Sequence, residues 1–528
     1  MPYPMPARRR HVPTITTLAL ALSIALPAIA QDSTSTEEPG EIDAIQVLGS
    51  RAKNRTAAET AAPVDIIRAE QIERTGAREL GQLLQMLEPS FNFSRTTISD
   101  GTDILRPATL RSLGADQVLV LVNGKRRHQQ ALVNVQQTIA RGSAGTDINA
   151  IPVTAIERIE VLRDGAAAQY GSDAIAGVIN IVLKKQTKET QLFFEAGQTR
   201  EGDGTVLHGG LNHGFALGDD GFLNVSVEYR DREETNRAGP DTLRVDPPRV
   251  TQRIGDADAK DAYLWLNGGI ELGGGELYWF GGLSQRKGDS SGFYRSAGDG
   301  RTVPELYPNG FLPNIITTVE DGSLAVGYRS QIGDTWDWDV SVNHGRSKFG
   351  FFERNSVNVS WWYEPNPIIG APIPVPYRQS PTSADTGTLK FDQTTVNLDF
   401  RGSIEIGSSE PLSLAVGGEY RNENYAIEAG DPVSYSYGRT NNPAIIILNQ
   451  NGGFAAPGIQ GFPGFSPNEE VDDGRNSYAL YVDAETRFGG KFLVGGALRF
   501  EDYSDFGNTT TGKLSLRYDF TDTFAMRG

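Results

Sequence analysis

The chain has 528 residues, with 60 glycines, 38% hydrophobic residues and no cysteine. This length exceeds a single compact core, and a chain without cysteine has neither a disulfide framework nor a thiolate metal site. The formal net charge of -17 argues against nucleic acid as a partner, because phosphates require a basic protein surface.

The first 30 residues are predicted to be a cleaved secretory signal peptide. Three arginines at positions 8–10 precede an apolar run at positions 14–26, and Ala28-Ile29-Ala30 fits an A-x-A cleavage site before Gln31. The apolar run is far shorter than the roughly 20 residues that a membrane-spanning helix requires, which argues against the alternative of a membrane anchor.

Residues 31–55 are predicted to be a tether. Its first ten residues are rich in Ser, Thr and Glu and are too polar to fold alone. Residues 41–51 (EIDAIQVLGSR) then carry a short, β-prone apolar segment. An extended segment with free edges can add a strand to the sheet of a partner protein. The alternative is that this segment is the first strand of the following domain.

Residues 56–185 are predicted to form a small α+β domain. One of its helices carries Leu80, Leu83, Leu84 and Leu87 at helical spacing, so these side chains are expected to pack against the sheet of the domain. The expected elements at the start of the domain are a strand at 64–67, helices at 69–75 and 78–87, and loops at 91–103 and 129–147.

Two blocks of this domain have a specific pattern. Residues 109–128 (TLRSLGADQVLVLVNGKRRH) contain an apolar strand at 118–122 that is followed by Asn-Gly, a favoured hairpin pair. Residues 156–185 (IERIEVLRDGAAAQYGSDAIAGVINIVLKK) contain two apolar strands around a segment of small residues. The second of these strands is a nearly continuous apolar run, which is typical of a strand buried on both faces. The small residues allow backbone to pass close to backbone.

These two blocks, in this order, resemble the plug domain of TonB-dependent outer-membrane receptors. The match begins at Ile151-Pro152 and departs mainly at 164–166 (DGA), where the family more often has Gly-Pro. The resemblance implies a plug inside a membrane β-barrel, with the two loops near the ligand-facing apex. It also implies that the tether is periplasmic and presents a TonB box to a TonB-type energy-coupling protein of the inner membrane, through Ile42, Asp43, Ala44, Ile45, Gln46, Val47 and Leu48.

From residue 189 onward, apolar and polar residues alternate in segments of about ten residues, as in membrane β-strands. Clear examples are residues 223–230 (LNVSVEYR) and 336–343 (WDWDVSVN). Short connections on one side and long ones on the other are typical of outer-membrane barrels. The short connections are expected at 217–221, 272–275, 333–335 and 488–491, and the long ones at 231–260, 287–320, 349–388 and 426–475.

Residues 189–528 are therefore predicted to form an antiparallel membrane β-barrel that is incomplete. About 12 strands are expected, against the roughly 22 strands of plugged outer-membrane transporters. The chain is accordingly expected to be truncated and to hold the plug and the N-terminal part of the barrel.

Charged side chains supply two groups of candidate site residues. The first group is expected to seat the plug through ion pairs with inward-facing barrel residues that remain breakable. The second group is a candidate for contact with an anionic ligand such as a ferric siderophore, since guanidinium groups bind carboxylate or catecholate oxygens; plug seating or a solvated surface is its alternative. The seating group is Arg111, Glu157, Arg158, Glu160, Arg163 and Glu419, and the ligand group is Arg95, Lys125, Arg126, Arg127, His128 and Arg141.

The resemblance implies a monomeric receptor in the outer membrane of a Gram-negative cell, in contact with membrane lipid. It would bind a scarce extracellular solute, most commonly a ferric siderophore in this family, and import it to the periplasm. The sequence carries no hydrolase or metalloprotease motif, and no enzyme activity, cofactor or metal site is predicted. The alternative is an outer-membrane enzyme or adhesin that uses the barrel only as an anchor.

Overall fold

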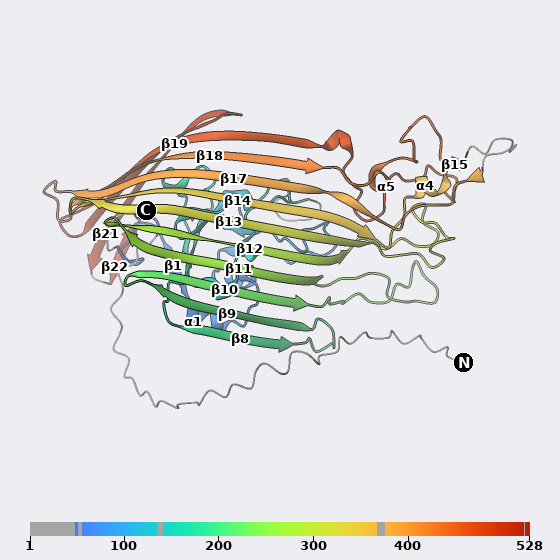
Figure 1. The fold of residues 1–528 in the computed structure, drawn as a ribbon, viewed down its shortest axis with the longest axis horizontal. Helices are drawn as coiled ribbons and strands as arrows, with labels where there is room; N and C mark the ends of the chain where they lie inside the picture. Colours follow the sequence, from blue (N-terminus) through green and yellow to red (C-terminus); the bar gives the residue numbers. More distant parts are fainter. Residues whose placement is uncertain (1–47, 51–54, 136–140, 367–374, 522) are drawn as a thin grey trace. The chain divides into compact units, whose positions relative to one another are not determined.

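The computed structural model describes residues 48–50, 55–135, 141–366, 375–521 and 523–528. The predicted signal peptide and residues 42–47 of the predicted TonB box lie outside this described part. The described residues form a small α+β domain, the plug, and a large antiparallel sheet (Figure 1). Within them, no helix has the length and apolar character needed to cross a membrane.

The plug contains a five-stranded sheet in the order β1-β6-β7-β4-β5. Strand β4 runs parallel to β7, and the other neighbours are antiparallel. Every residue of β4 and β7 is buried, as the apolar sequences of these strands predict. The elements of the plug are β1 (Val64–Arg68), α1 (Ala69–Arg74), α2 (Leu80–Leu87), β2 (Phe91–Phe93), β3 (Ala108–Leu110), β4 (Val118–Val122), β5 (Lys125–Arg126), β6 (Ile156–Leu162), α3 (Ala167–Tyr170) and β7 (Gly177–Leu183).

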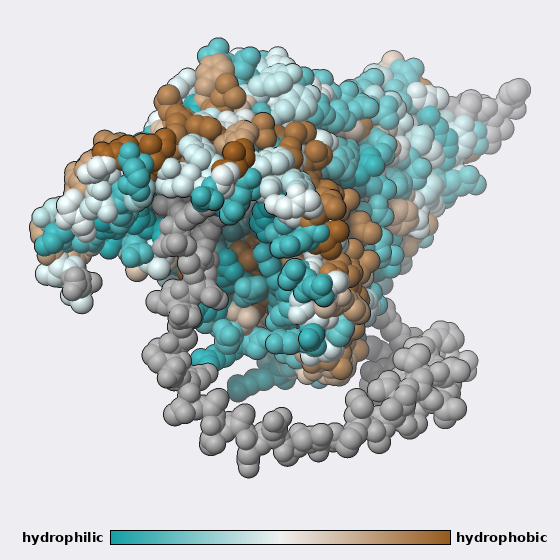
Figure 2. Space-filling view, turned by 60° about the vertical axis from the view of Figure 1, so that its left-hand side comes forward, coloured by the Kyte–Doolittle hydropathy of each residue, from teal (hydrophilic) through white to brown (hydrophobic). Residues whose placement is uncertain are grey.

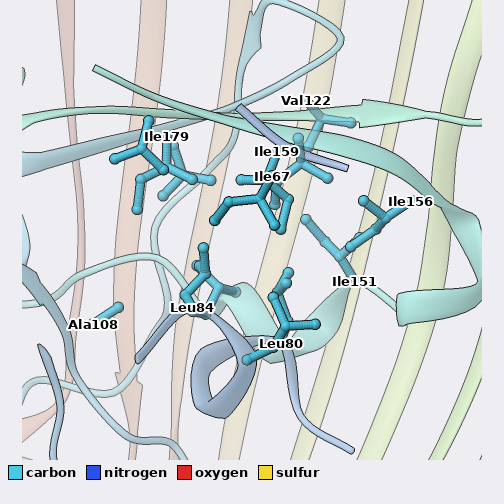
Figure 3. Close-up of a cluster of buried hydrophobic side chains, with 14 of the residues drawn as sticks. Ile67, Leu80, Leu84, Ala108, Val122, Ile151, Ile156, Ile159 and Ile179 are labelled. Atoms are coloured by element: carbon cyan, nitrogen blue, oxygen red, sulfur yellow. The ribbon is translucent and has the colours of Figure 1, made fainter. Parts of the chain in front are cut away.

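Helix α2 packs its leucines beneath this sheet. Leu80, Leu83 and Leu84 are buried and belong to the same apolar cluster as Ile159 and Ile179 of the sheet. Figure 3 shows Leu80 and Leu84 directed toward the isoleucines of the sheet. The helical spacing of the leucines therefore gives the plug an apolar core of its own.

The large sheet has 13 strands among the described residues, and consecutive strands pair with one another (Figure 1). Within this described part the sheet is open, with β8 and β22 at its two ends. The predicted fold class, a plug with an incomplete antiparallel barrel, is confirmed. The strands are β8 (Thr190–Gly197), β9 (Val206–Leu217), β10 (Gly221–Arg232), β11 (Asp258–Leu272), β12 (Gly275–Ser291), β13 (Asn314–Ile332), β14 (Trp336–Arg354), β17 (Ser383–Ile404), β18 (Leu412–Glu428), β19 (Val471–Phe488), β20 (Phe492–Tyr503), β21 (Gly507–Thr521) and β22 (Phe524–Arg527).

The two faces of this sheet have the polarity of a membrane barrel. On β10, Val227 and Tyr229 are 45% and 50% exposed, whereas the intervening Glu228 and Arg230 are each 3% exposed. Apolar side chains gather in patches on the surface in Figure 2. A soluble sheet would bury the apolar set, so this inverse arrangement indicates an outer face that contacts lipid and an inner face that contacts the plug.

Connections are short at one end of the strands and mostly long at the other. Strands β11 and β12 are joined by two residues, whereas β12 and β13 are joined by residues 292–313 and β18 and β19 by residues 429–470. Figure 1 shows short elements among the long connections at the right-hand end of the strands. These elements are α4 (Val359–Tyr363), β15 (Pro365–Asn366), β16 (Val375–Pro376) and α5 (Pro432–Tyr435).

Leu264 tests the assignment of the outer face, because it lies near the middle of β11 and is 42% exposed. A Leu264→Arg substitution is expected to lower the free energy of unfolding in lipid vesicles by about 2–4 kcal/mol, the cost of a cation at the bilayer midplane. Leu243→Arg, in the long connection after β10, is the matched control and is expected to change little. Equal effects of the two substitutions in a urea titration would contradict the assignment.

Candidate functional site

The plug carries four consecutive polar residues, Lys125–His128, which we call the basic run. The run begins in β5, directly after the hairpin turn at Asn123 and Gly124, where both residues have positive φ of 48° and 80°. An Asn-Gly pair adopts this geometry readily. Because β5 is the last strand in the order of the plug sheet, the run lies at the edge of the plug and reaches the barrel wall.

Lys125 bridges two barrel strands. Its Nζ lies 2.7 Å from Oδ1 of Asp339 on β14 and 3.4 Å from Oδ2 of Asp399 on β17. Tyr278 donates its hydroxyl proton to Asp339, and Tyr481 donates to Asp399 at 2.6 Å. The ammonium and both carboxylates thus have partners in a site that is mostly shielded from water.

Arg126 joins the plug to β18. Its guanidinium pairs with Asp173 of the plug, and Nη2 donates to the carbonyl oxygen of Tyr170 at 2.7 Å. Its Nε lies 3.9 Å from Oε1 of Glu419, which is also 3.3 Å from Nη2 of Arg499. Glu419 therefore faces the plug, and its nearest plug cation is Arg126.

Arg127 and His128 share one carboxylate of the wall, Asp321 on β13. Arg127 pairs with Asp321 and lies over the ring of Trp265, with its guanidinium carbon 5.3 Å from the ring centroid. The Nε2 atom of His128 lies 2.9 Å from Oδ2 of Asp321. Burial lowers the pKa of His128, so the neutral ring donates this hydrogen bond at pH 7. Removing Asp321 would leave a buried guanidinium without its counter-ion.

A second charged network holds the other side of the plug, around Glu79 at the start of α2. Its carboxylate lies 2.6 Å from Arg232 of β10 and 3.3 Å from Arg106 of the plug. Burial by itself raises the pKa of Glu79, but the surrounding guanidiniums outweigh it and hold this pKa well below its ordinary value. Nearby, Arg286 of β12 lies 3.3 Å from Asp147 of the plug. The carboxylate of Glu79 is therefore charged at pH 7, and the plug is held by ion pairs on this side too.

The described start of the chain also contacts both parts. Leu48 is buried in an apolar cluster with Leu121 and Leu162 of the plug, and the backbone N–H of Gly49 donates to the Tyr170 hydroxyl at 3.2 Å. Arg55 then pairs with Glu485 of β19 at 2.8 Å. The last residue of the predicted TonB box is thus packed on the plug, and the segment that follows is tied to the wall.

Four predicted seating residues form their ion pairs within the plug. Arg158 pairs with Glu157 at 3.2 Å and with Glu160 at 3.0 Å, and Arg163 pairs with Asp65. All these partners lie within the plug, because β6 is an inner strand with β1 and β7 as its neighbours. These residues therefore stabilise the plug sheet and do not contact the wall through these pairs.

Arg111, another residue of the predicted seating group, also makes its contact within the plug. It lies in an exposed turn after β3, and its Nη1 is 3.4 Å from the carbonyl oxygen of Ala176, again within the plug. Glu419, the wall residue of the same predicted group, lies next to Arg126.

The predicted ligand group divides into two sets. The side chains of Lys125 to His128 contact barrel carboxylates or plug partners, which fits the alternative of plug seating, and their contact with a ligand stays a prediction. Arg95 and Arg141 keep exposed side chains, with Arg95 at 3.7 Å from Asp256. The loop that carries Arg141 contacts the long-connection end of the wall, since Ala131 donates to Ser347 at 3.1 Å.

The wall carboxylates that receive the basic run were missed by the sequence predictions. Asp321, Asp339 and Asp399 are acidic residues at inward positions of β13, β14 and β17. The alternation of Trp338, Asp339 and Val340 predicts that the aspartate points inward, so the sequence did hold a signal for these carboxylates. Alternation does not predict how the plug is rotated relative to the wall, and this rotation decides which carboxylate meets which cation.

Comparison with known proteins was consistent over both parts of the chain. A family model described as the TonB-dependent Receptor Plug Domain matches residues 56–178, and a model described as TonB dependent receptor-like, beta-barrel, matches residues 278–528. The vitamin B12 transporter BtuB of Vibrio cholerae serotype O1 is 33% identical over 211 residues, which are 40% of this chain and 31% of that protein. The ferric enterobactin receptor of Pseudomonas aeruginosa is 34% identical over 185 residues, which are 34% of this chain and 24% of that protein.

A solved structure, the siderophore receptor PirA of Acinetobacter baumannii, superimposes with a TM-score of 0.60 at 18% identity and covers 88% of this chain and 60% of that one. At this identity the likeness shows the fold alone. The chain thus matches less than two thirds of the length of each of these proteins. With a plug model and a barrel model of one family matching in order, the chain belongs to the TonB-dependent receptors.

Proposed function

We propose that this protein is a TonB-dependent transporter of the outer membrane. It binds a scarce extracellular solute on the long-connection side and imports it to the periplasm, where the short connections lie in outer-membrane barrels. Energy comes from a TonB-type partner that binds Ile42–Leu48. The protein acts as a monomer surrounded by outer-membrane lipid.

One observation carries this proposal: a plug with its own apolar core is held against the polar face of a membrane sheet by charged contacts. Apolar contacts inside the plug keep it folded, whereas ion pairs at its edge regain hydration when they separate in water. Such a plug can close a path and open it again. The alternative of a barrel-anchored enzyme or adhesin is not favoured by the relatives, which are named as transporters and receptors.

The position of Leu48 supports the role of the segment before it. Leu48 packs against Leu121, which lies in β4 next to the basic run. A pull on residues 42–47 would therefore act first on Leu48 and then on β4, the strand that precedes the basic run. Extended segments of this kind can bind a partner by adding a strand to its sheet.

The proposed cargo is an anionic metal chelate, with ferric siderophores as the first candidates. Relatives named as ferric enterobactin and vitamin B12 proteins mark two cargo classes to compare. Arg95 and Arg141 are the exposed cations that remain from the predicted ligand group, and guanidinium groups suit carboxylate or catecholate oxygens. We propose that these two arginines contact the cargo.

Deletion of residues 42–47 is expected to abolish uptake of radioactive iron from ferric enterobactin, or of the chelate that supports growth, without changing binding at the cell surface. Leu48 is retained because it is packed in the plug. Deletion of residues 34–39, an equally long part of the tether, is the control and is expected to leave uptake intact. Uptake that survives the first deletion would rule out coupling through this segment.

A growth panel tests the cargo. Cells that depend on this protein are expected to grow on a ferric siderophore and not on vitamin B12 or saccharides. Replacing Arg95 and Arg141 by Ala is expected to weaken chelate binding by tenfold or more, since a hydrogen bond to a charged group contributes about 1.5–3 kcal/mol. Arg244→Ala, an exposed arginine in the long connection after β10, is the control. Growth on vitamin B12 alone, or equal effects of all three substitutions, would refute the cargo assignment.

A further inference from the structure

Three of the long connections fold together at one end of the wall into a unit that we call the cap. The cap consists of residues 292–313, 355–366, 375–382 and 429–470. Helices α4 and α5 belong to it (Figure 1). Val303, Val359 and Ile447, one from each connection, are almost fully buried in a shared apolar cluster. Asn358 Nδ2 also donates to the carbonyl oxygen of Val433 at 2.8 Å. The cap therefore has a core of its own.

The cap rests on the plug through a layer of aromatic side chains. Phe462 and Phe465 of the cap pack against an apolar cluster that includes Leu105 of the plug and Phe351 of β14. The rings of Phe351 and Phe462 are stacked, with their centroids 4.3 Å apart. Gly101, in the plug loop after β2, reaches the same layer, because a Cβ there would lie 3.3 Å from the Phe351 ring. The cap thus closes directly on this loop of the plug.

Two carboxyl groups are buried at this contact, one from the wall and one from the plug loop. Glu353 of β14 is 0% exposed, and Asp100 of the plug is 6% exposed. Oε1 of Glu353 accepts from the backbone N–H of Phe462 at 3.0 Å, whereas its Oε2 has no hydrogen-bond partner among the described residues. A Cβ at Gly461 would collide with Oε2. The backbone of the cap is therefore folded over the carboxyl group of Glu353.

Glu353 lies beyond the membrane part of the wall. Strand β14 has 19 residues, whereas a membrane strand takes about 9–11. After Val342, the next outward positions of β14 are His344, Arg346 and Lys348, which are polar or charged. Glu353 comes after these positions, at the long-connection end of the strand. Its carboxyl group can therefore exchange protons with the aqueous phase on that side.

The surroundings of the two acids favour their protonated forms. Burial raises the pKa of Asp100 to about 6 and the pKa of Glu353 well above its ordinary value. The charge of Asp103 raises the pKa of Asp100 further, and the charge of Asp100 does the same for Glu353. The guanidinium of Arg295, in the cap, opposes these effects at both carboxyl groups. The two buried acids thus share the cation of Arg295, and together they retain protons that exposed carboxyls have lost.

The remaining neighbours change this balance little. On the sheet, the cross-strand neighbours of Glu353 are Ile315 and Ala384, which carry no charge. Arg295 Nε donates to Oε1 of Gln460 at 3.4 Å, which holds the guanidinium in the cap. The other charged groups that act on Arg295 or Asp103 are Asp299, Arg301, Arg106 and Arg253. Of these, Asp299 and Arg301 pair with each other at 2.8 Å.

We propose that Asp100 and Glu353 form a proton-dependent switch that closes the cap on the plug when both carboxyl groups are protonated. In the closed cap the acids bind protons that they release once the cap lifts and water reaches them, so a falling pH strengthens closure. The contribution is fully present below about pH 4, the ordinary range of carboxyl groups, and is lost as the pH rises through about 6. The switch needs neither cargo nor a TonB-type partner, so it goes beyond the proposed function.

Hydrogen exchange of the full chain in lipid vesicles tests the switch. The reporters are the backbone amides of residues 458–465, several of which donate hydrogen bonds, such as Phe465 N–H to the carbonyl oxygen of Thr386 at 3.0 Å. Dividing each rate by the intrinsic exchange rate at the same pH gives a protection factor, which reports the opening of the cap alone. Residues 262–270 of β11 are the internal reference.

Protection of residues 458–465 is expected to fall at least about tenfold between about pH 5 and about pH 8. This is the factor for one proton that is bound with a pKa of about 6 in the closed cap and of about 4 in the open cap. Protection of residues 262–270 is expected to stay constant. A protection factor of the cap that does not change with pH, that falls as the pH falls, or that changes equally in the reference would overturn the inference.

A double variant, Asp100→Asn with Glu353→Gln, removes both titrating groups and keeps their shapes. Asn tolerates the positive φ of 48° at Asp100. Protection of the cap in this variant is expected to be independent of pH, and the reference residues report whether its sheet is folded. Glu305→Gln, which changes an exposed acid of the cap, is the matched control and is expected to keep the natural response. A double variant that also keeps this response would refute the switch. Because cargo and TonB are absent, none of these results bears on the uptake experiments.

Discussion

The buried ion pairs between the plug edge and the barrel wall are the contacts on which the rest of the structure depends. Lys125, Arg127 and their wall carboxylates occupy positions where neither partner has much access to water. A buried charge without its partner costs several kcal/mol, so these pairs fix the plug in one orientation. The same charges regain hydration when plug and wall separate in a wet lumen. Firm seating and reversible opening therefore come from one kind of contact.

The apolar contacts divide the molecule in a complementary way. Leucines of α2 and isoleucines of the plug sheet form the interior of the plug, while the apolar side chains of the barrel mostly face outward. The core cluster extends to a few inward aromatic residues of β11 and β12, such as Trp265. A second apolar cluster joins Leu105 and Leu132 of the plug to Phe349 and Leu389 of the wall, so separation of plug and wall exposes apolar surface there as well as polar groups.

Much of the fold could be predicted from the sequence, because it depends on short-range pattern. Strict alternation in residues such as 223–230 identifies inward and outward positions, and the Asn123-Gly124 pair locates the hairpin. The contacts of the site could not be predicted to the same extent. Arg158 and Arg163 look equivalent to Arg127 as plug cations, but β6 lies inside the plug sheet and β5 lies at its edge. Strand order and the rotation of the plug within the wall are long-range properties that a single sequence does not encode locally.

A double-mutant cycle on Arg127 and Asp321 measures the seating contact most directly. The plug-unfolding free energy would be determined by urea titration for Arg127→Met, Asp321→Ala and the double variant. Each single substitution is expected to cost about 3–5 kcal/mol, because it leaves a charge buried without its partner, and the double substitution is expected to cost far less than the sum. Additive costs would contradict the claim that buried ion pairs hold the plug against the wall.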